Sequence, residues 1–165
     1  MKKVITILGK RSSESSTRKI VEKWADKNIV LNQKKHINML NQLYLDETFD
    51  GAKDILLELK KKLSGYKAQD INKNLFDKTK FIKMAELKEK LVLSTLNCYY
   101  CRLPMLLMYD KPREVMQWTL DRIDNDQGHN NNNVVISCLK CNLKRRTTNS
   151  DKFKFTKQMK IIKTY

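Results

Sequence analysis

The chain has 165 residues, with 34 Lys and Arg against 18 Asp and Glu and a formal net charge of +16. This length allows one domain or two small ones, and the basic excess favours a polyanionic partner, above all a nucleic acid. No run of 18 apolar residues occurs, and the N-terminal apolar stretch is too short for a signal peptide, so we expect no membrane association and an intracellular, non-secreted protein. Alternatively, the basic excess reflects lysines on solvent-exposed helix faces and no polyanionic partner.

The first 95 residues predict a basic helical domain that binds or positions DNA. Residues 4–8 are a candidate short strand or a buried N-terminal turn, and four stretches of apolar residues at helical spacing follow. These stretches run through Ile20 and Trp24, Ile37 and Tyr44, Ile55 and Leu63, and Phe81 and Val92. Gly65 is expected to end the third helix. His36 has no neighbour of the metal-ligand type, so we interpret it as a surface or capping residue.

Residues 96–165 predict a second unit, which opens at two CxxC pairs. Cys98 and Cys101 form the first pair, and Cys138 and Cys141 form the second. Reducing compartments disfavour disulfides, so the pairs indicate metal binding. Four thiolates close a tetrahedral zinc site with no open position, which predicts structural Zn²⁺ rather than a catalytic ion. Free cysteines or a redox pair are the alternative.

Between the cysteine pairs the sequence predicts two strands and the start of a helix. Residues 117–124, QWTLDRID, alternate as a strand does, and residues 133–137, NVVIS, form the second strand. The intervening loop, residues 125–132, contains a glycine and several asparagines that suit tight turns. Because a helix is expected directly after Cys138, the unit is ββα. The predicted fold class is α+β and mainly helical.

Four segments of this unit together resemble the HNH endonucleases of the zinc-stapled ββα-metal kind. The segments are CYYC, LDRID, GHNNNNVVISC and CLKCNLKRR, and the resemblance covers residues 98 to about 148. It implies a DNA endonuclease that uses Mg²⁺ or Mn²⁺. On the family pattern Asp121 and Asn142 are the ligands of the catalytic ion, and Asn133 fixes the loop and the backbone of the first strand. The Asp-Arg-Ile-Asp form is similar to homing-type and viral members.

The sequence departs from the family pattern at Arg122, where the resemblance implies a histidine that deprotonates the attacking water. Arginine cannot accept a proton at ordinary pH. His129, in the loop, is therefore the candidate general base. A route through substrate phosphate or metal-bound water, and loss of catalysis, remain alternatives. Arg122 itself is assigned either to the scissile phosphate or to an ion pair with Asp124, and Asp124 is also a candidate extra metal ligand.

Basic residues of the predicted C-terminal helices are expected to contact nucleic-acid phosphates, and a solvated basic face is the alternative. We also expect Arg145 to bind the scissile phosphate. The expected phosphate contacts are Lys140, Lys144, Arg145, Arg146, Lys152 and Lys154.

We therefore predict a metal-dependent HNH-type DNA endonuclease. A catalytically inactive nucleic-acid-binding or architectural protein with the HNH fold is the alternative. RNA and branched DNA remain open as substrates, and a homodimer would supply the two sites that cutting both strands requires. The Lys-rich and Asn-rich composition hints at a virus or mobile element, with the host cytoplasm or nucleus as the location.

Overall fold

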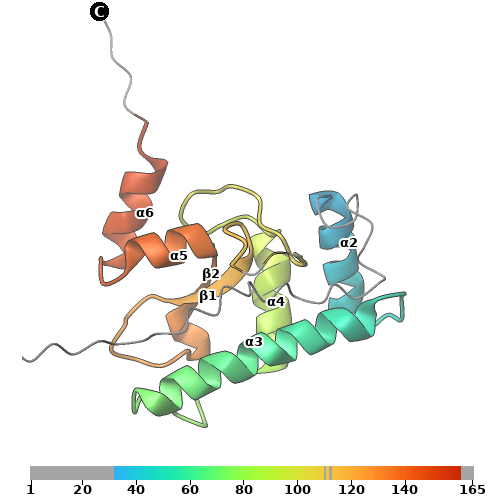
Figure 1. Ribbon diagram of the computed structural model, residues 1–165, viewed down its shortest axis with the longest axis horizontal. Helices are drawn as coiled ribbons and strands as arrows, with labels where there is room; N and C mark the ends of the chain where they lie inside the picture. The colour runs from blue at the N-terminus through green and yellow to red at the C-terminus, as the bar shows by residue number, and fades with distance from the viewer. Residues whose placement is uncertain (1–31, 110, 112, 161–165) are drawn as a thin grey trace, which may run out of the picture.

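The computed structural model describes residues 32–109, 111 and 113–160 (Figure 1). The predicted strand at residues 4–8 and the helix through Trp24 lie outside these residues. No helix in the described part of the chain is both long enough and apolar enough to cross a membrane. The elements, in chain order, are α2 (Gln33–Tyr44), α3 (Ala52–Asn72), α4 (Met84–Ser94), β1 (Trp118–Arg122), the 3₁₀ helix η2 (Asn131–Asn133), β2 (Val134–Cys138), α5 (Leu139–Arg145) and α6 (Ser150–Gln158).

Helix α2 begins at Asn32, whose side chain accepts the backbone N–H of Lys35 and so satisfies one free donor of the first turn. Its buried face, which includes Leu40 and Leu43, packs against α4. His36 lies on the same face and is fully buried, so the predicted surface location is wrong. Its Nδ1 accepts the backbone N–H of Leu107 at 3.3 Å, which gives the ring a structural role within the core.

Helix α3 continues through Gly65 to Asn72, so the predicted end at Gly65 is wrong. A Cβ placed at Gly65 would meet no atom within 4 Å, which means that neither strain nor crowding requires glycine there. The helix extends because its last turns have tertiary partners. Tyr66 accepts the backbone N–H of Leu120 at 3.0 Å, and Asp70 is buried against the loop that follows β1. Contacts remote in sequence outweigh the weak helix propensity of one glycine.

Strands β1 and β2 pair antiparallel, with Asp121 opposite Val135, and α5 starts directly after β2. Both strands and the helix start lie where the sequence predicts them. Helix α5 packs on both strands, and α4 packs on β2. The α+β class, with a small sheet and a majority of helices among its elements, is confirmed.

One hydrophobic core spans the described chain. It contains Leu40 of α2, Leu59 of α3, Leu91 of α4, Trp118 of β1 and Ile136 of β2 in a single cluster of buried side chains. Figure 1 shows the sheet at the centre, with α3 running along one side of the molecule. Residues on both sides of the boundary predicted near residue 95 contribute to this cluster.

Candidate functional site

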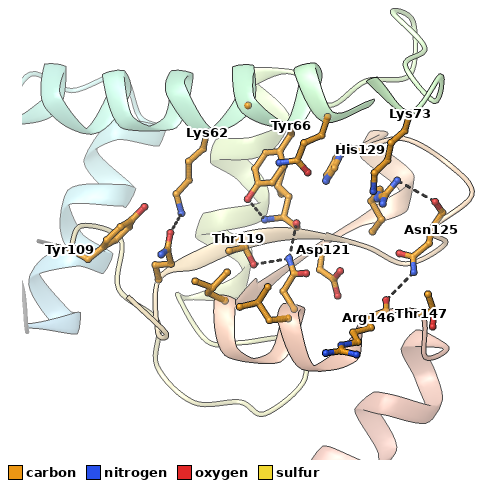
Figure 2. A pocket seen from close by; sticks show the side chains of 18 residues that line it. Lys62, Tyr66, Lys73, Tyr109, Thr119, Asp121, Asn125, His129, Arg146 and Thr147 are labelled. Carbon is orange, nitrogen blue, oxygen red and sulfur yellow. Dashed lines mark hydrogen bonds between the residues drawn. The ribbon is translucent and has the colours of Figure 1, made fainter. Parts of the chain in front are cut away.

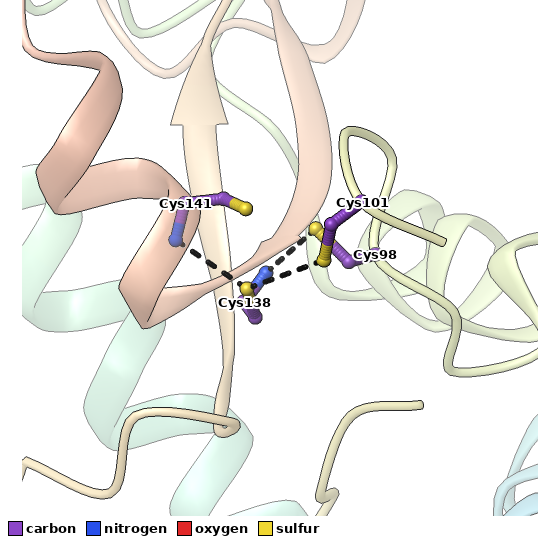
Figure 3. A group of neighbouring side chains, drawn as sticks. All are labelled: Cys98, Cys101, Cys138 and Cys141. Carbon is purple, nitrogen blue, oxygen red and sulfur yellow. Dashed lines mark hydrogen bonds between the residues drawn. The ribbon is translucent and has the colours of Figure 1, made fainter. Parts of the chain in front are cut away.

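The four cysteines meet at one point of the fold (Figure 3). Their sulfur atoms all lie within 4.8 Å of one another, and the Cys101 and Cys138 sulfurs are 4.0 Å apart. Zinc–sulfur bonds of about 2.3 Å in a tetrahedron place sulfurs about 3.8 Å apart, so the cluster is close to the size that zinc requires. The group can therefore bind a metal ion such as zinc.

Hydrogen bonds favour the metal-binding thiolate form at Cys98, whereas the hydrogen bond with the Cys98 sulfur raises the pKa of the Cys138 thiol and burial raises that of Cys141. The backbone N–H of Cys138 donates to the Cys98 sulfur at 3.3 Å, and the N–H of Cys141 donates to the Cys138 sulfur at 3.4 Å. The side-chain hydrogen bond with Cys138, together with backbone donors, lowers the pKa of the Cys98 thiol to about 5, although burial opposes this shift. All four positions join the loop after α4 to β2 and α5, so a bound ion would hold these segments together.

A cleft of about 780 Å³ lies between α3 and α5, with residues of β1 at its base (Figure 2). The predicted site residues that line it are Asp121, Arg122, His129, Asn142 and Arg146. Helix α3 supplies the opposite wall with Lys62 and Tyr66, and Lys73 extends this wall directly after the helix ends. The structure thus brings acidic, amide, imidazole and basic groups from both halves of the chain into one open space.

Asp121 is held in a buried two-point ion pair with Arg145. Its Oδ2 accepts from Arg145 Nε at 2.7 Å and its Oδ1 accepts from Arg145 Nη2 at 3.0 Å. The Tyr100 hydroxyl also donates to Oδ2 at 2.7 Å. Asp121 is 5% exposed and Arg145 is 2% exposed, so both charges are largely removed from water.

Arg145 does not lie on the exposed basic face where the sequence analysis puts it. Besides Asp121, its guanidinium donates to the carbonyl oxygens of Arg122 and Thr148 and to Asn125 Oδ1. A buried cation needs such acceptors to offset its loss of hydration. The prediction that Arg145 is exposed and contacts phosphate is therefore wrong, because these hydrogen bonds hold its side chain inside the fold.

Asn142, on the first turns of α5, faces the first strand. Its Nδ2 donates to Thr119 Oγ1 at 3.1 Å and to the carbonyl oxygen of Leu120 at 3.2 Å. A carbonyl can only accept, so the amide nitrogen must face it and the orientation of the amide is determined. The Asn142 side chain lines the cleft. Its Oδ1 atom makes no hydrogen bond with any residue in the described ranges.

His129 is bound to Asp70 at the C-terminal end of α3. Its Nδ1 lies 2.7 Å from Asp70 Oδ1, and its backbone N–H donates to Asp70 Oδ2 at 2.6 Å. The ring also packs against the Tyr66 ring, tilted by 35° and with 4.6 Å between ring centroids. Burial lowers the pKa of His129 below its ordinary value, although Asp70 acts in the opposite direction. The net shift favours the neutral form of the imidazole.

The loop between β1 and η2 is fixed by its own polar groups. Arg122 Nη1 donates to the carbonyl oxygens of Asn125 and Gln127 at 3.2 and 3.1 Å. The Asp124 carboxylate accepts the N–H of Asp126 and the side chain of Gln127, and these hydrogen bonds lower the pKa of Asp124. The direct ion pair between Arg122 and Asp124 that the sequence suggests is therefore replaced by separate loop contacts.

Asn133 closes this loop, as the resemblance implies. Its Nδ2 donates to the carbonyl oxygens of Asp124 and Gly128 at 2.9 and 3.0 Å, and its Oδ1 accepts the N–H of Asp124 at 2.9 Å. The side chain is buried, so its role in the structure is to hold the loop rather than to contact a substrate.

The remaining basic candidates differ in exposure. Lys140, Lys144, Arg146 and Lys152 are exposed, and Arg146 lies at the edge of the cleft. Lys154 lies over the ring of Tyr99 at 4.1 Å, a cation–π contact that anchors α6.

Three residues at the site carry no signal that the sequence analysis recognised. Asp70 and Tyr66 lie far from the ββα unit in sequence, and helical periodicity alone gave no reason to select them. Tyr100 stands inside the first CxxC pair, where burial and its contact with Asp121 raise its pKa. Only long-range contacts identify these roles.

Comparisons with protein-family models, with curated proteins and with solved structures find no match. Function is therefore inferred from the residues that line the cleft and from the cysteine cluster.

Removal of metal from the cysteine cluster is expected to destabilise the whole fold. Purified protein should contain a single zinc ion per chain by elemental analysis, and a strong chelator should lower its melting temperature by roughly 10 °C, because binding to the native state alone is lost. Adding Zn²⁺ back should restore the melting temperature, whereas Mg²⁺ should not. Absence of bound metal together with an unchanged melting temperature would contradict the zinc interpretation.

Arg145→Ala is expected to reduce the free energy of unfolding by about 3–5 kcal/mol, because it leaves the buried Asp121 carboxylate without its cation. The matched control is Lys144→Ala, an exposed position on the same helix, which should change stability by no more than about 0.5 kcal/mol. Urea denaturation followed by circular dichroism measures both. Equal effects of the two substitutions would contradict a buried ion pair.

Proposed function

We propose that the protein is a metal-dependent HNH-type endonuclease that hydrolyses phosphodiester bonds in nucleic acid. The observation that carries the proposal is the cleft, which Asp121, Asn142 and His129 line together with basic side chains from α3, from β1 and from Arg146 directly after α5. Oxygen donors, a neutral imidazole and cations are the groups that phosphodiester hydrolysis needs in one place.

Asp121 and Asn142 would hold Mg²⁺ or Mn²⁺. A carboxylate has about four lone-pair positions, and Arg145 and Tyr100 occupy three of those on Asp121. One position on Asp121 Oδ1 remains, and Asn142 Oδ1 is a second oxygen. Two protein oxygens suit Mg²⁺, which keeps waters and takes phosphate oxygens for the rest of its shell. Such an ion would stabilise the charge that develops on the phosphate and on the leaving oxygen.

His129 is the proposed general base in place of the histidine that Arg122 replaces. Asp70 occupies its Nδ1 side, and no residue in the described part of the chain forms a hydrogen bond with Nε2. A neutral imidazole with one free nitrogen can accept the proton of an attacking water. Burial lowers its pKa, which favours the unprotonated form that a general base requires.

Arg122 and the basic residues of the cleft would bind the substrate backbone. Within the described residues the loop carbonyls bind Nη1 of Arg122, and its Nε and Nη2 donors form no hydrogen bond there, so these donors can bind a phosphate. Lys73 and Arg146 lie on opposite walls of the cleft (Figure 2). Exposed Lys140, Lys144 and Lys152 extend the positive surface along α5 and α6. Such a basic surface would bind the phosphate backbone of a duplex DNA, a branched DNA or an RNA, so each of these remains a candidate substrate.

A nucleic-acid-binding protein without catalysis is the second candidate, and the Asp121–Arg145 pair favours it. The guanidinium neutralises the carboxylate that the divalent ion requires. An inactive protein would keep the zinc cluster and the basic surface, and its affinity for DNA would still fall steeply with salt. Metal-dependent cleavage separates the two candidates.

Supercoiled plasmid incubated with the protein and Mg²⁺ or Mn²⁺ is expected to become nicked, and chelation should abolish nicking. His129→Ala and Asn142→Ala should each reduce the initial rate by about 100-fold or more, since each removes a group that acts at the phosphate. Gel electrophoresis of time points measures the rate.

The matched control is Asn41→Ala, an exposed position on α2 away from the cleft, which should nick like the wild type. Circular dichroism melting verifies that each variant is folded. Salt-sensitive binding without nicking at any metal concentration would contradict the nuclease and leave the binding protein.

A further inference from the structure

We propose that Asp70 of α3 is the positioning residue of the general base. It holds the His129 imidazole with its proton on Nδ1, so that Nε2 is the nitrogen that accepts a proton in the cleft. This inference rests on the proposed function of His129. It assigns to α3, which lies outside the ββα unit, a part of the reaction centre.

The contact between Asp70 and His129 has two points. One carboxylate oxygen accepts the backbone N–H of His129 at 2.6 Å and the other meets Nδ1 at 2.7 Å. A carboxylate only accepts hydrogen bonds, so the ring proton of a neutral imidazole must lie on Nδ1. The Asp70 side chain is 1% exposed and the His129 side chain is 6% exposed, so water does not compete strongly for the hydrogen bond between them.

The approach of the carboxylate to the loop depends on Gly128. A Cβ at this position would lie 2.9 Å from Asp70 Oδ2 and 2.5 Å from the carbonyl oxygen of Leu75. Leu75 in turn donates its N–H to the Asp70 carbonyl at 2.8 Å, which reverses the chain after α3. On its other side, the Gly128 carbonyl accepts from Asn133. The end of α3 and the loop between the strands therefore pack closely at the Asp70 carboxylate, which orients the His129 ring.

Charged and titratable groups surround the imidazole on two elements. Helix α3 contributes Tyr66, which packs against the ring one turn before Asp70, and β1 contributes Asp121 and Arg122. Burial lowers the pKa of His129, Arg122 acts in the same direction, and Asp70 and Asp121 oppose it. Asp70 therefore has two effects, because it selects the tautomer and it also keeps the nitrogen basic enough to accept a proton.

The tautomer can be read directly in the full-length protein. The chain contains two histidines, so nitrogen-15 NMR of the ring atoms gives two sets of signals, which His129→Gln assigns. The expected result for the wild type at pH 8 is a proton on Nδ1 of His129. A proton on Nε2 would overturn the proposal without any change to the fold.

The kinetic test is Asp70→Asn, which keeps the shape of the side chain and removes its charge. The nicking rate should fall by about 100-fold or more, because an amide no longer enforces the Nδ1–H tautomer. The acidic limb of the pH–rate profile should move to lower pH, because the imidazolium loses its negative neighbour. The matched control, Asp77→Asn in the segment after α3, should leave the rate and the profile unchanged.

The outcomes separate this inference from the proposed function. If the wild type nicks DNA but Asp70→Asn retains its rate within about two-fold, the positioning role is overturned and the nuclease stands. If His129→Gln also retains the rate, a different group is the base and the role of Asp70 falls with it. If the wild type does not nick at all, the proposed function is overturned, and the catalytic role of Asp70 with it, even where NMR finds the Nδ1–H tautomer.

Discussion

A buried carboxylate, Asp70, is the constraint on which much of the described structure depends. An anion that is withdrawn from water is tolerated only where hydrogen-bond donors replace its hydration, and the donors here are the backbone and the ring of His129. This requirement brings the C-terminal end of α3 against the loop between the strands. It also explains why α3 passes through Gly65, since a helix that ended there would leave His129 without its partner.

The second buried charge, Asp121, is satisfied in a different way. Arg145 and Tyr100 surround its carboxylate, so α5 and the first CxxC pair are tied to β1 through one side chain. In the proposed reaction a divalent ion would find this carboxylate already neutralised by a guanidinium. The negative charge of a substrate phosphate would then supply the remaining attraction for the divalent ion. The strength of the Asp121–Arg145 ion pair therefore affects whether the protein cleaves nucleic acid or only binds it.

The structural features that depend on local sequence patterns could be predicted from the sequence. Alternation identified β1, the apolar run NVVIS identified β2, and the spacing of the cysteines identified the cluster at which their sulfur atoms meet. The partners of buried polar groups could not be predicted. His36 and Arg145 look like surface residues in sequence, because their acceptors and donors come from distant segments. Asp70 is one acidic residue at the end of a helix, and only the packing of α3 against the loop gives it a role.

We expect Asp70 and His129 to be energetically coupled across the two halves of the chain. A double-mutant cycle with Asp70→Ala, His129→Ala and the combined variant measures this coupling through their free energies of unfolding in urea. A buried hydrogen-bonded pair of this kind predicts an interaction energy of about 1–3 kcal/mol. Strict additivity of the two substitutions would contradict the account, because α3 and the loop would then be held together by other contacts.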